Sequence, residues 1–437
     1  RVQEIMNQTN ASLVVASASQ SVAFAHLFDT VEVSSHTLRN DRPNSDQTNH
    51  TLPQMRSGEP ALVLFTSGST GKPKGIVIEH GAIATRMLVE GRAFHYRGAR
   101  TLQFAATTWD IFMTDVFTTL TYQGCICIPN EQDRRLNLSR FCKDFNVTLA
   151  LMTPTLASIL DPAAFPTLKT LIFGGEALQQ DVVSKWSFPN GPRIFQGYGP
   201  AETGPCVTGR VAERPEILGT PLENSLCVLV DPNNHEKLVP LGAIGELVVG
   251  GPSLLREYIG NSSITSLATL DNPSWVRDLD TSVTHFYRTG DLLRYSIDTM
   301  DGSLEFVGRK DDQVKYHGQR IELKEIEHHL NEIPEVESST VILVRKGCFK
   351  DKLVAVVQCI GHRAQHNTCG TPSIVQDSGF NYSKMRSSLS PRLPDYMIPN
   401  ELIVVDRLPH TSSMKLDKSH ITNWISDMQK SLVERTA

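Results

Sequence analysis

The sequence lacks any apolar run close to the roughly 18–20 residues that a membrane-spanning helix needs, and its first residues form no secretory signal. It also lacks an excess of positive charge, because 42 Lys and Arg stand against 47 Asp and Glu, for a formal net charge of −5. Binding to a nucleic-acid backbone needs clustered basic residues. We therefore expect neither a membrane segment nor a nucleic-acid partner. A small phosphate-bearing ligand needs only one local site and is compatible with this charge.

The eight cysteines lack a metal-binding arrangement. Cys125 and Cys127 form the only close pair, and a C-x-C spacing in an apolar stretch differs from that of zinc sites. Buried, reduced thiols in a cytoplasmic protein are the simplest interpretation. The chain begins at Arg1, without a Met, so we expect a piece of a longer protein.

The first 200 residues alternate between short apolar runs and segments with helical spacing. The runs, which end in Gly, Pro, Thr or Ser, lie at 61–69, 102–108, 125–129, 148–154, 170–176 and 193–199. This alternation predicts a large, layered α/β domain with a mostly parallel sheet. The carboxyl ends of such strands are where ligands bind. A polar segment at 31–60 is expected to form a surface loop.

The pattern changes twice further along the chain. From about 219 to 308 helices become scarce, and apolar runs bounded by turn residues predict a β-rich subdomain such as a distorted barrel. After this, the segment ELKEIEHHL places Leu323, Ile326 and Leu330 on one helical face. Two apolar strands follow it. We predict a large N-terminal unit over 1–309 and a small C-terminal α+β lid domain over 310–437.

Residues 66–75 read TSGSTGKPKG, which raises the question of a nucleotide P-loop. The P-loop pattern is G-x-x-x-x-G-K-[ST], and it fails here because only two residues separate the glycines and a proline follows the first lysine. The composition still favours phosphate, since glycines let backbone N–H groups converge on an anion and hydroxyls and Lys74 add donors. A flexible surface loop is the alternative, but the position after a buried-type strand favours a ligand loop.

This loop resembles the signature loop of the adenylate-forming enzymes, which include nonribosomal peptide synthetase adenylation domains, acyl-CoA synthetases and luciferases. Other segments resemble the family's motifs in the same order. They are GYGPAET at 197–203, GELVVGG at 245–251, YRTGDLLRY at 287–295, GRKDDQVKYHGQRIELKEIE at 308–327, LPDYMIP at 393–399 and LPHTSSMKLDK at 408–418. The "YGP" form, FAATTWDIF at 104–112 and "D-x-Q-V-K" favour a peptide-synthetase adenylation domain. The segment DRRLNLSRF at 133–141 resembles fungal members. The start of the family's large domain is expected to be missing.

The resemblance implies that ATP and a carboxylic acid give an acyl-adenylate and pyrophosphate. The acyl group then passes to the phosphopantetheine thiol of a carrier protein, with condensation domains as further partners in the same synthetase. Glu202 would hold Mg²⁺, Tyr198 would stack on adenine, and Asp291 would bind the ribose hydroxyls. The implied ATP-binding residues are Thr66, Ser67, Gly68, Ser69, Thr70, Gly71, Lys74, Gly174, Gly175, Glu176, Tyr198, Gly199, Asp291 and Arg309.

The resemblance also implies a moving lid. Lys415 would bridge the substrate carboxylate, the ribose and the α-phosphate during adenylation. Asp311 would be the hinge about which the small domain rotates, exchanging Lys415 for a face at 310–320 that carries Lys315. Two departures from the family pattern put adenylation efficiency in question: Ala201 replaces a threonine, and Ser413-Met414 replaces Asn-Gly before Lys415.

The same resemblance predicts the substrate pocket. Its residues would be Ala105, Ala106, Trp109, Leu151, Ile172, Gly174, Gly197, Pro205 and Cys206. In the family an aspartate usually pairs with the substrate's α-ammonium, and that position aligns with Ala105. A buried ammonium without a partner is costly. An aryl, hydroxy or keto acid is therefore the expected substrate, with a large non-proteinogenic amino acid as the alternative.

Two other functions remain open at the sequence level. A stand-alone acyl- or aryl-CoA ligase would pass the acyl group to free CoA rather than to a carrier protein. A degenerate, non-catalytic domain would act as a scaffold within a megasynthase, and the two departures are compatible with that reading.

Overall fold

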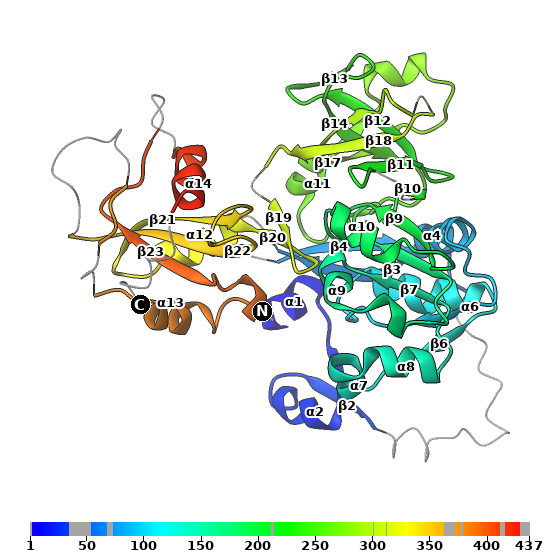
Figure 1. Cartoon of the computed structure of the whole chain (residues 1–437), viewed down its shortest axis with the longest axis horizontal. Helices are drawn as coiled ribbons and strands as arrows, with labels where there is room; N and C mark the ends of the chain where they lie inside the picture. The colour runs from blue at the N-terminus through cyan, green and yellow to red at the C-terminus, as the bar shows by residue number, and fades with distance from the viewer. Residues whose placement is uncertain are drawn as a thin grey trace.

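The computed structural model describes residues 2–34, 54–67, 73–210, 214–299, 301–311, 313–361, 372–375, 379–410 and 416–428. A larger body carries most of the chain, and the C-terminal residues form a smaller body beside it (Figure 1). Strands β19 (Gln313–Tyr316) and β20 (Gln319–Glu322) lie between the two. None of the described helices has the length and apolar character needed to cross a membrane.

The N-terminal residues form a small unit with exposed apolar side chains. It consists of α1 (Val2–Thr9), β1 (Leu13–Ser17), α2 (Ala18–Phe24) and β2 (Asp29–Val33). Strands β1 and β2 pair in parallel as a two-stranded sheet. Parallel sheets are usually covered on both faces, whereas Val15 and Val22 are 65% and 78% exposed here. The predicted polar loop at 31–60 contains the end of β2, and residues 35–53 lie outside the described part.

The parallel sheet lies at the centre of the larger body. Its strands, in spatial order β6-β5-β7-β8-β9, are β5 (Arg100–Leu102), β6 (Cys125–Cys127), β7 (Leu149–Met152), β8 (Thr170–Phe173) and β9 (Arg193–Tyr198). All their pairings are parallel, and every residue of β7 and β8 is buried, as continuous apolar runs predict. The predicted α/β fold is confirmed.

Helices cover this sheet. They are α4 (His80–Ala93), α5 (Ile111–Met113), the π-helix η2 (Thr114–Thr118), α6 (Thr119–Thr121), α7 (Glu131–Leu136), α8 (Leu138–Asp144), α9 (Pro154–Ile159), the 3₁₀ turn η3 (Pro162–Ala164) and α10 (Gln180–Trp186). The run at 61–69 is an exception to the predicted alternation. It forms β3 (Pro60–Thr66), which pairs antiparallel with β4 (Lys74–Glu79) in a separate three-stranded sheet.

The β-rich region predicted over about 219–308 continues the parallel sheet. Its elements are β10 (Val207–Arg210), β11 (Ile217–Pro221), β12 (Leu226–Asp231), β13 (Asn234–Leu238), β14 (Gly245–Gly250), β15 (Glu257–Tyr258), α11 (Ser262–Ala268), β16 (Thr269–Asp271), the 3₁₀ turn η4 (Ser274–Asp278), β17 (His285–Tyr295) and β18 (Leu304–Arg309). Apart from β15, which pairs with β4, its strands join the sheet through antiparallel pairings, and β10 links them to β9. The described strands form an open path, so the expected barrel does not close.

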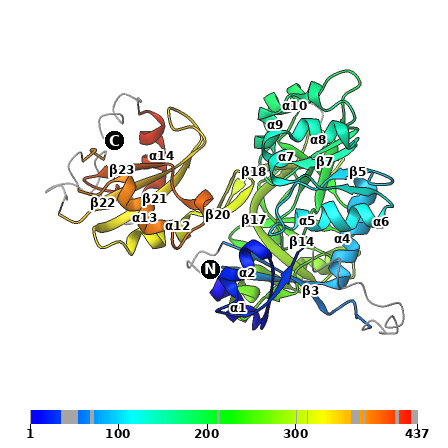
Figure 2. The same ribbon diagram turned by 90° about the horizontal axis from the view of Figure 1, so that it is seen from below.

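The C-terminal body is an α+β unit, as Figure 2 shows from a second side. After β19 and β20 come α12 (Leu323–Asn331), β21 (Val336–Val344), β22 (Lys352–Cys359), α13 (Tyr382–Leu389), the 3₁₀ turn η5 (Asp395–Met397), β23 (Glu401–Val405) and α14 (Lys418–Ser426). The predicted apolar face of α12 is buried against the sheet. Both apolar clusters of this body contain only residues from 314 onward. We therefore propose a domain division after Arg309.

Candidate functional site

Three predicted ATP-binding side chains meet where β9 adjoins the antiparallel strands. Tyr198 ends β9, and Asp291 and Arg309 face each other across the β17–β18 ladder. The Tyr198 hydroxyl donates to Asp291 Oδ2, and Arg309 Nη1 lies 2.5 Å from Asp291 Oδ1. Asp291 is only 3% exposed, and burial together with its charge holds the pKa of Tyr198 well above the ordinary value. The cluster is therefore a preorganised polar site at the sheet edge.

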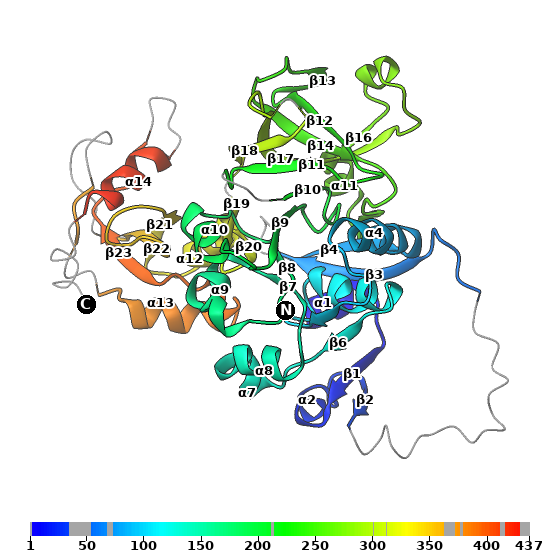
Figure 3. The same cartoon turned by 45° about the vertical axis from the view of Figure 1, so that its right-hand side comes forward.

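The β19–β20 hairpin places a cation over this cluster. Its turn residues His317 and Gly318 both have positive φ, the geometry of a tight two-residue hairpin turn. Nζ of Lys315 lies 5.4 Å from the centre of the Tyr198 ring, within the range of a cation–π contact. Burial is the main reason why the pKa of Lys315 is lowered. Figure 3 shows the hairpin beside the ends of the parallel strands.

The predicted metal ligand Glu202 is paired with the same hairpin. Arg320 Nη1 lies 2.8 Å from Glu202 Oε2, and the Tyr258 hydroxyl donates to Oε1 at 2.7 Å. Burial raises the pKa of Glu202, but the Arg320 charge and the Tyr258 hydrogen bond outweigh it and hold the pKa below the ordinary value. Carboxylate oxygen suits Mg²⁺, yet both oxygens have partners in this arrangement. A metal would take the place of Arg320.

The hairpin also contacts the flanks of the predicted phosphate loop. Thr66 and Lys74 face each other across β3 and β4. Ser67 donates to the Arg320 carbonyl at 2.8 Å and accepts from the Glu322 backbone N–H at 3.2 Å. Lys74 Nζ lies 3.7 Å from Glu322 Oε1. The central residues Gly68, Ser69, Thr70 and Gly71, like Lys415 near the C-terminus, lie outside the described residues.

The remaining predicted ATP-binding residues lie in the turns after β8 and β9. Gly175 has φ +82°, a conformation that favours glycine. At Gly199 a side chain would collide with the Gly204 carbonyl, so glycine is required for this tight turn. Glu176 Oε2 accepts from the backbone N–H and hydroxyl of Thr155. Asp311 forms a bidentate pair with Arg309, with N–O distances of 2.6 and 2.8 Å, where the chain leaves β18.

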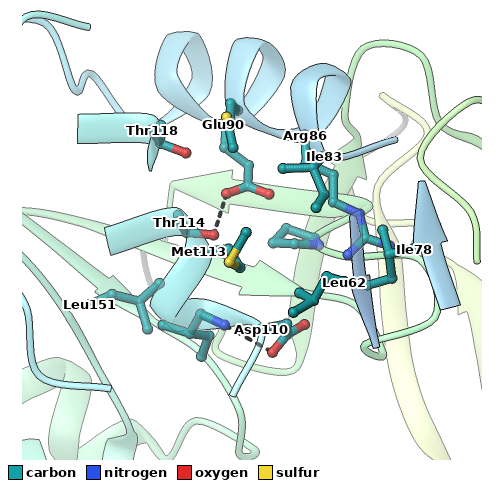
Figure 4. A pocket seen from close by; sticks show the side chains of 13 residues that line it. Leu62, Ile78, Ile83, Arg86, Glu90, Asp110, Met113, Thr114, Thr118 and Leu151 are labelled. Atoms are coloured by element: carbon teal, nitrogen blue, oxygen red, sulfur yellow. Dashed lines mark hydrogen bonds between the residues drawn. The ribbon is translucent and has the colours of Figure 1, made fainter. Parts of the chain in front are cut away.

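A small cavity lies next to this site, between α4, the α5–η2 helical segment and the sheet (Figure 4). The space that the centre of a water molecule can occupy in it is about 40 Å³. Its lining residues are Leu62, Ile78, Ile83, Arg86, Met87, Glu90, Asp110, Ile111, Met113, Thr114, Thr118, Leu151 and Pro205. Only Leu151 and Pro205 were predicted from the sequence. Ala106, Ile172, Gly174, Gly197 and Cys206 do not line it.

The position predicted for the missing charge partner lies outside this cavity. Ala105 does not line the cavity, and its backbone N–H points to Asp115 Oδ2 at 3.4 Å. Trp109 does not line it either, because its ring lies against the hairpin turn, where a Cβ on Gly318 would collide with it. Asp110, the next residue in the same FAATTWDIF segment, does line the cavity. The cavity therefore contains a carboxylate that the predicted pocket did not include.

Two acids and one arginine give this cavity a polar side. Arg86 donates to the carbonyls of Ser253, at 3.0 and 2.7 Å, and Ala201, at 3.2 Å. Burial lowers the pKa of Arg86. It raises that of Asp110, where the Arg86 charge opposes it. Burial also raises the pKa of Glu90 to about 7, against the Thr114 hydrogen bond and the Arg86 charge. Sequence reading missed Arg86 and Glu90, since charges on a helix usually face solvent.

Comparison with known proteins places the chain in a family. Residues 1–259 match the model of the family described as AMP-binding enzyme. A nonribosomal peptide synthetase-like enzyme, fsqF of Aspergillus fumigatus, is 60% identical over 98% of this chain and 29% of its own length. N-benzoylphenylalaninol synthetase apmA of Penicillium brevicompactum is 36% identical over 98% of the chain and 18% of its own length.

Solved structures agree on the fold. The Vibrio cholerae adenylation domain AlmE, in complex with glycyl-adenosine-5'-phosphate, has a TM-score of 0.75 at 20% identity and covers 98% of this chain and 82% of its own. PA1221, an adenylation and carrier-domain protein, has a TM-score of 0.74 at 21% identity over 96% of this chain and 68% of its own. The chain thus belongs to the AMP-binding enzymes. The chain spans less than a third of the length of these curated relatives, which are a nonribosomal peptide synthetase-like enzyme and a synthetase.

Proposed function

We propose that this domain activates an amino acid at the expense of ATP. A substrate carboxylate oxygen attacks the α-phosphorus, the bond to pyrophosphate breaks, and an acyl-adenylate forms. A carrier-protein phosphopantetheine thiol then attacks the acyl carbon, loses its proton and releases AMP. The observation that carries the proposal is the joint presence of the Tyr198–Asp291–Arg309 cluster and the neighbouring cavity with Asp110.

Asp110 changes the expected substrate. A carboxylate in a buried cavity matches an ammonium group, since a buried charge needs a partner. The aryl, hydroxy or keto acid expected from Ala105 is therefore replaced by an acid that carries an α-ammonium. Asp110 also accepts from the Ile111 backbone N–H at 3.0 Å, at the start of α5, so the helix start fixes its orientation.

The hairpin position is compatible with the second half-reaction. Lys315 and Arg320 fill the space beside Tyr198 and Glu202, and we propose that this face is exchanged for Lys415 during adenylation, about the hinge at Asp311. Mg²⁺ would then be held by Glu202 after Arg320 has moved away, and would help to neutralise the phosphates. Charge stabilisation of this kind dominates phosphate chemistry.

ATP–pyrophosphate exchange over a panel of amino and aryl acids tests the proposal. We expect exchange with an α-amino acid and none with its des-amino analogue. Exchange with no acid at all would instead favour the scaffold function. Acyl transfer to free CoA in place of a carrier protein would favour a CoA ligase. A cytoplasmic location and condensation-domain partners remain predictions of the resemblance.

A further inference from the structure

A second acid lies in the cavity, across from Asp110. Glu90 of α4 is 1% exposed and lines the cavity, with Met113 and Thr114 between the two carboxylates (Figure 4). Its Oε2 accepts from the Thr114 hydroxyl at 2.8 Å. Within the described part of the chain no donor reaches Oε1. Thr118, on the same wall, is buried, and its hydroxyl has no partner among the described residues.

The Thr118 hydroxyl is a buried polar atom without a hydrogen bond among the described residues. A buried polar atom without a hydrogen bond costs about 1–3 kcal/mol, and such atoms in native proteins often mark a functional site. The π-helix η2 places both Thr114 and Thr118 on the cavity side. π-bulges inside helices recur at functional sites. The empty space beside Glu90 therefore has the chemistry of a subsite for a hydrogen-bond donor.

Charge balance restricts what that donor is. Arg86 lies one helical turn before Glu90 and interacts electrostatically with both cavity acids. With an α-ammonium bound and both acids ionised, Arg86 and the substrate ammonium supply two positive charges, and Asp110 and Glu90 supply two negative charges. A second ammonium or an added carboxylate would leave one charge uncompensated in a buried site, which is costly.

We propose that Glu90, with Thr114 and Thr118, recognises an uncharged hydrogen-bond donor, such as a hydroxyl, at the end of the substrate's side chain. This inference rests on the proposed amino-acid activation, in which Asp110 holds the α-ammonium. Sites built to hydrogen-bond a substrate hydroxyl reject the analogue that lacks it far more strongly than apolar pockets reject a methylene. Glu90 therefore decides which amino acid is accepted.

Pyrophosphate exchange on the full chain tests this with isosteric pairs: threonine and valine, serine and alanine, tyrosine and phenylalanine, with lysine and glutamate as charged side chains. The hydroxyl member of the preferred pair should exceed its partner in kcat/KM by at least about tenfold. Glu90→Leu should reduce that ratio to near one, and Glu90→Gln, which keeps a hydrogen-bonding side chain, should retain part of it. Because the ratio is taken within one variant, it does not depend on the fraction that folds.

Glu305→Gln is the matched control, since Glu305 is a buried carboxylate paired with Arg294 that does not line the cavity, and it should leave the ratio unchanged. Equal rates within every pair, a preference for a charged side chain, or an unchanged ratio in Glu90→Leu would each overturn the role of Glu90 while adenylation itself stands. Absence of exchange with every acid would overturn both proposals. In that outcome the adenylation reaction itself is missing, whereas failure of the Glu90 proposal alone leaves the reaction and removes only the preference for the hydroxyl.

Discussion

Replacing Asp110 by asparagine tests the substrate assignment most directly. The side chain keeps its size and its ability to accept from the Ile111 N–H, but it loses the negative charge in the cavity. Removing one partner of a buried ion pair costs about 3–5 kcal/mol. Because Asp110 is only partly buried, we take the lower end. At about 1.4 kcal/mol per tenfold change, kcat/KM for the amino acid should fall roughly 100-fold.

The matched measurement uses the same acid without its α-amino group. In the native enzyme the amino acid should be preferred by about two orders of magnitude, and in Asp110→Asn the two acids should react at similar rates. Asp115→Asn is the control, since Asp115 is buried five residues further on but does not line the cavity. The preference should survive there even if stability falls.

The pH dependence gives a second readout of the same group. Burial raises the pKa of Asp110, so the charged form is lost at a higher pH than for an ordinary aspartate. KM for the amino acid should rise in mild acid, while KM for the des-amino acid should not. An unchanged amino-acid preference in Asp110→Asn, or the same loss in Asp115→Asn, would refute the assignment.

Three further outcomes are expected. Tyr198→Phe removes the hydroxyl bound to Asp291, and loss of about 1 kcal/mol should raise KM for ATP about fivefold; an unchanged KM contradicts a role for that hydrogen bond. Arg320→Ala removes the partner of Glu202 and should slow thioester formation more than pyrophosphate exchange, as single-turnover measurements of each half-reaction will show; equal losses argue against the proposed exchange of faces. The pKa of Glu90 is raised from 4.5 to about 7. Burying its charged form therefore lowers the free energy of unfolding above pH 7, and this loss disappears as pH falls towards 4.5. In denaturant unfolding Glu90 should contribute a stability decrease of about 2.5 kcal/mol from pH 5 to pH 8. Buried Asp115, whose pKa is raised to about 8, adds to the slope in the same direction. Glu90→Gln should therefore reduce the slope by the Glu90 part, and an equal slope in both proteins would refute it.

The domain motion proposed here depends on which face of the lid meets the larger body. Polar contacts bind the hairpin in its present place. They include Lys315 over Tyr198, Arg320 with Glu202, Ser67 with the Arg320 carbonyl, and Lys74 with Glu322. The Trp109 ring against the hairpin turn adds an apolar contact. Interfaces of this kind are compatible with relative domain motion.

Ala201 departs from the family pattern without disturbing the site around it. Its carbonyl accepts from Arg86, which is the arginine that faces the two cavity acids. The backbone of the GYGPAET segment is therefore connected through Arg86 to the cavity. The missing hydroxyl at this position does not alter that connection, because the contact is made by the main chain.

The ordered motifs predicted three residues that the structure brings into one polar cluster. Tyr198, Asp291 and Arg309 were named from local sequence patterns, and the strand register brings Asp291 and Arg309 together. The apolar face of α12 was equally readable, because a period of 3.6 residues marks it directly. A sequence pattern within one strand or helix predicts which side chains share a face of that element, because this depends only on residues that are close in the sequence.

The sequence by itself determined the α/β class, the family and the residues proposed for the nucleotide site. Only the tertiary structure decided which residues line the neighbouring cavity. The run at 102–108 looked like a strand, but β5 ends at Leu102, and the loop that follows carries Asp110, rather than Ala105, to the cavity. Glu90 comes from a helix that precedes this segment, and its role depends on the packing of α4 against η2. Sequence spacing cannot show such a contact, because it is made by residues that are distant in the chain.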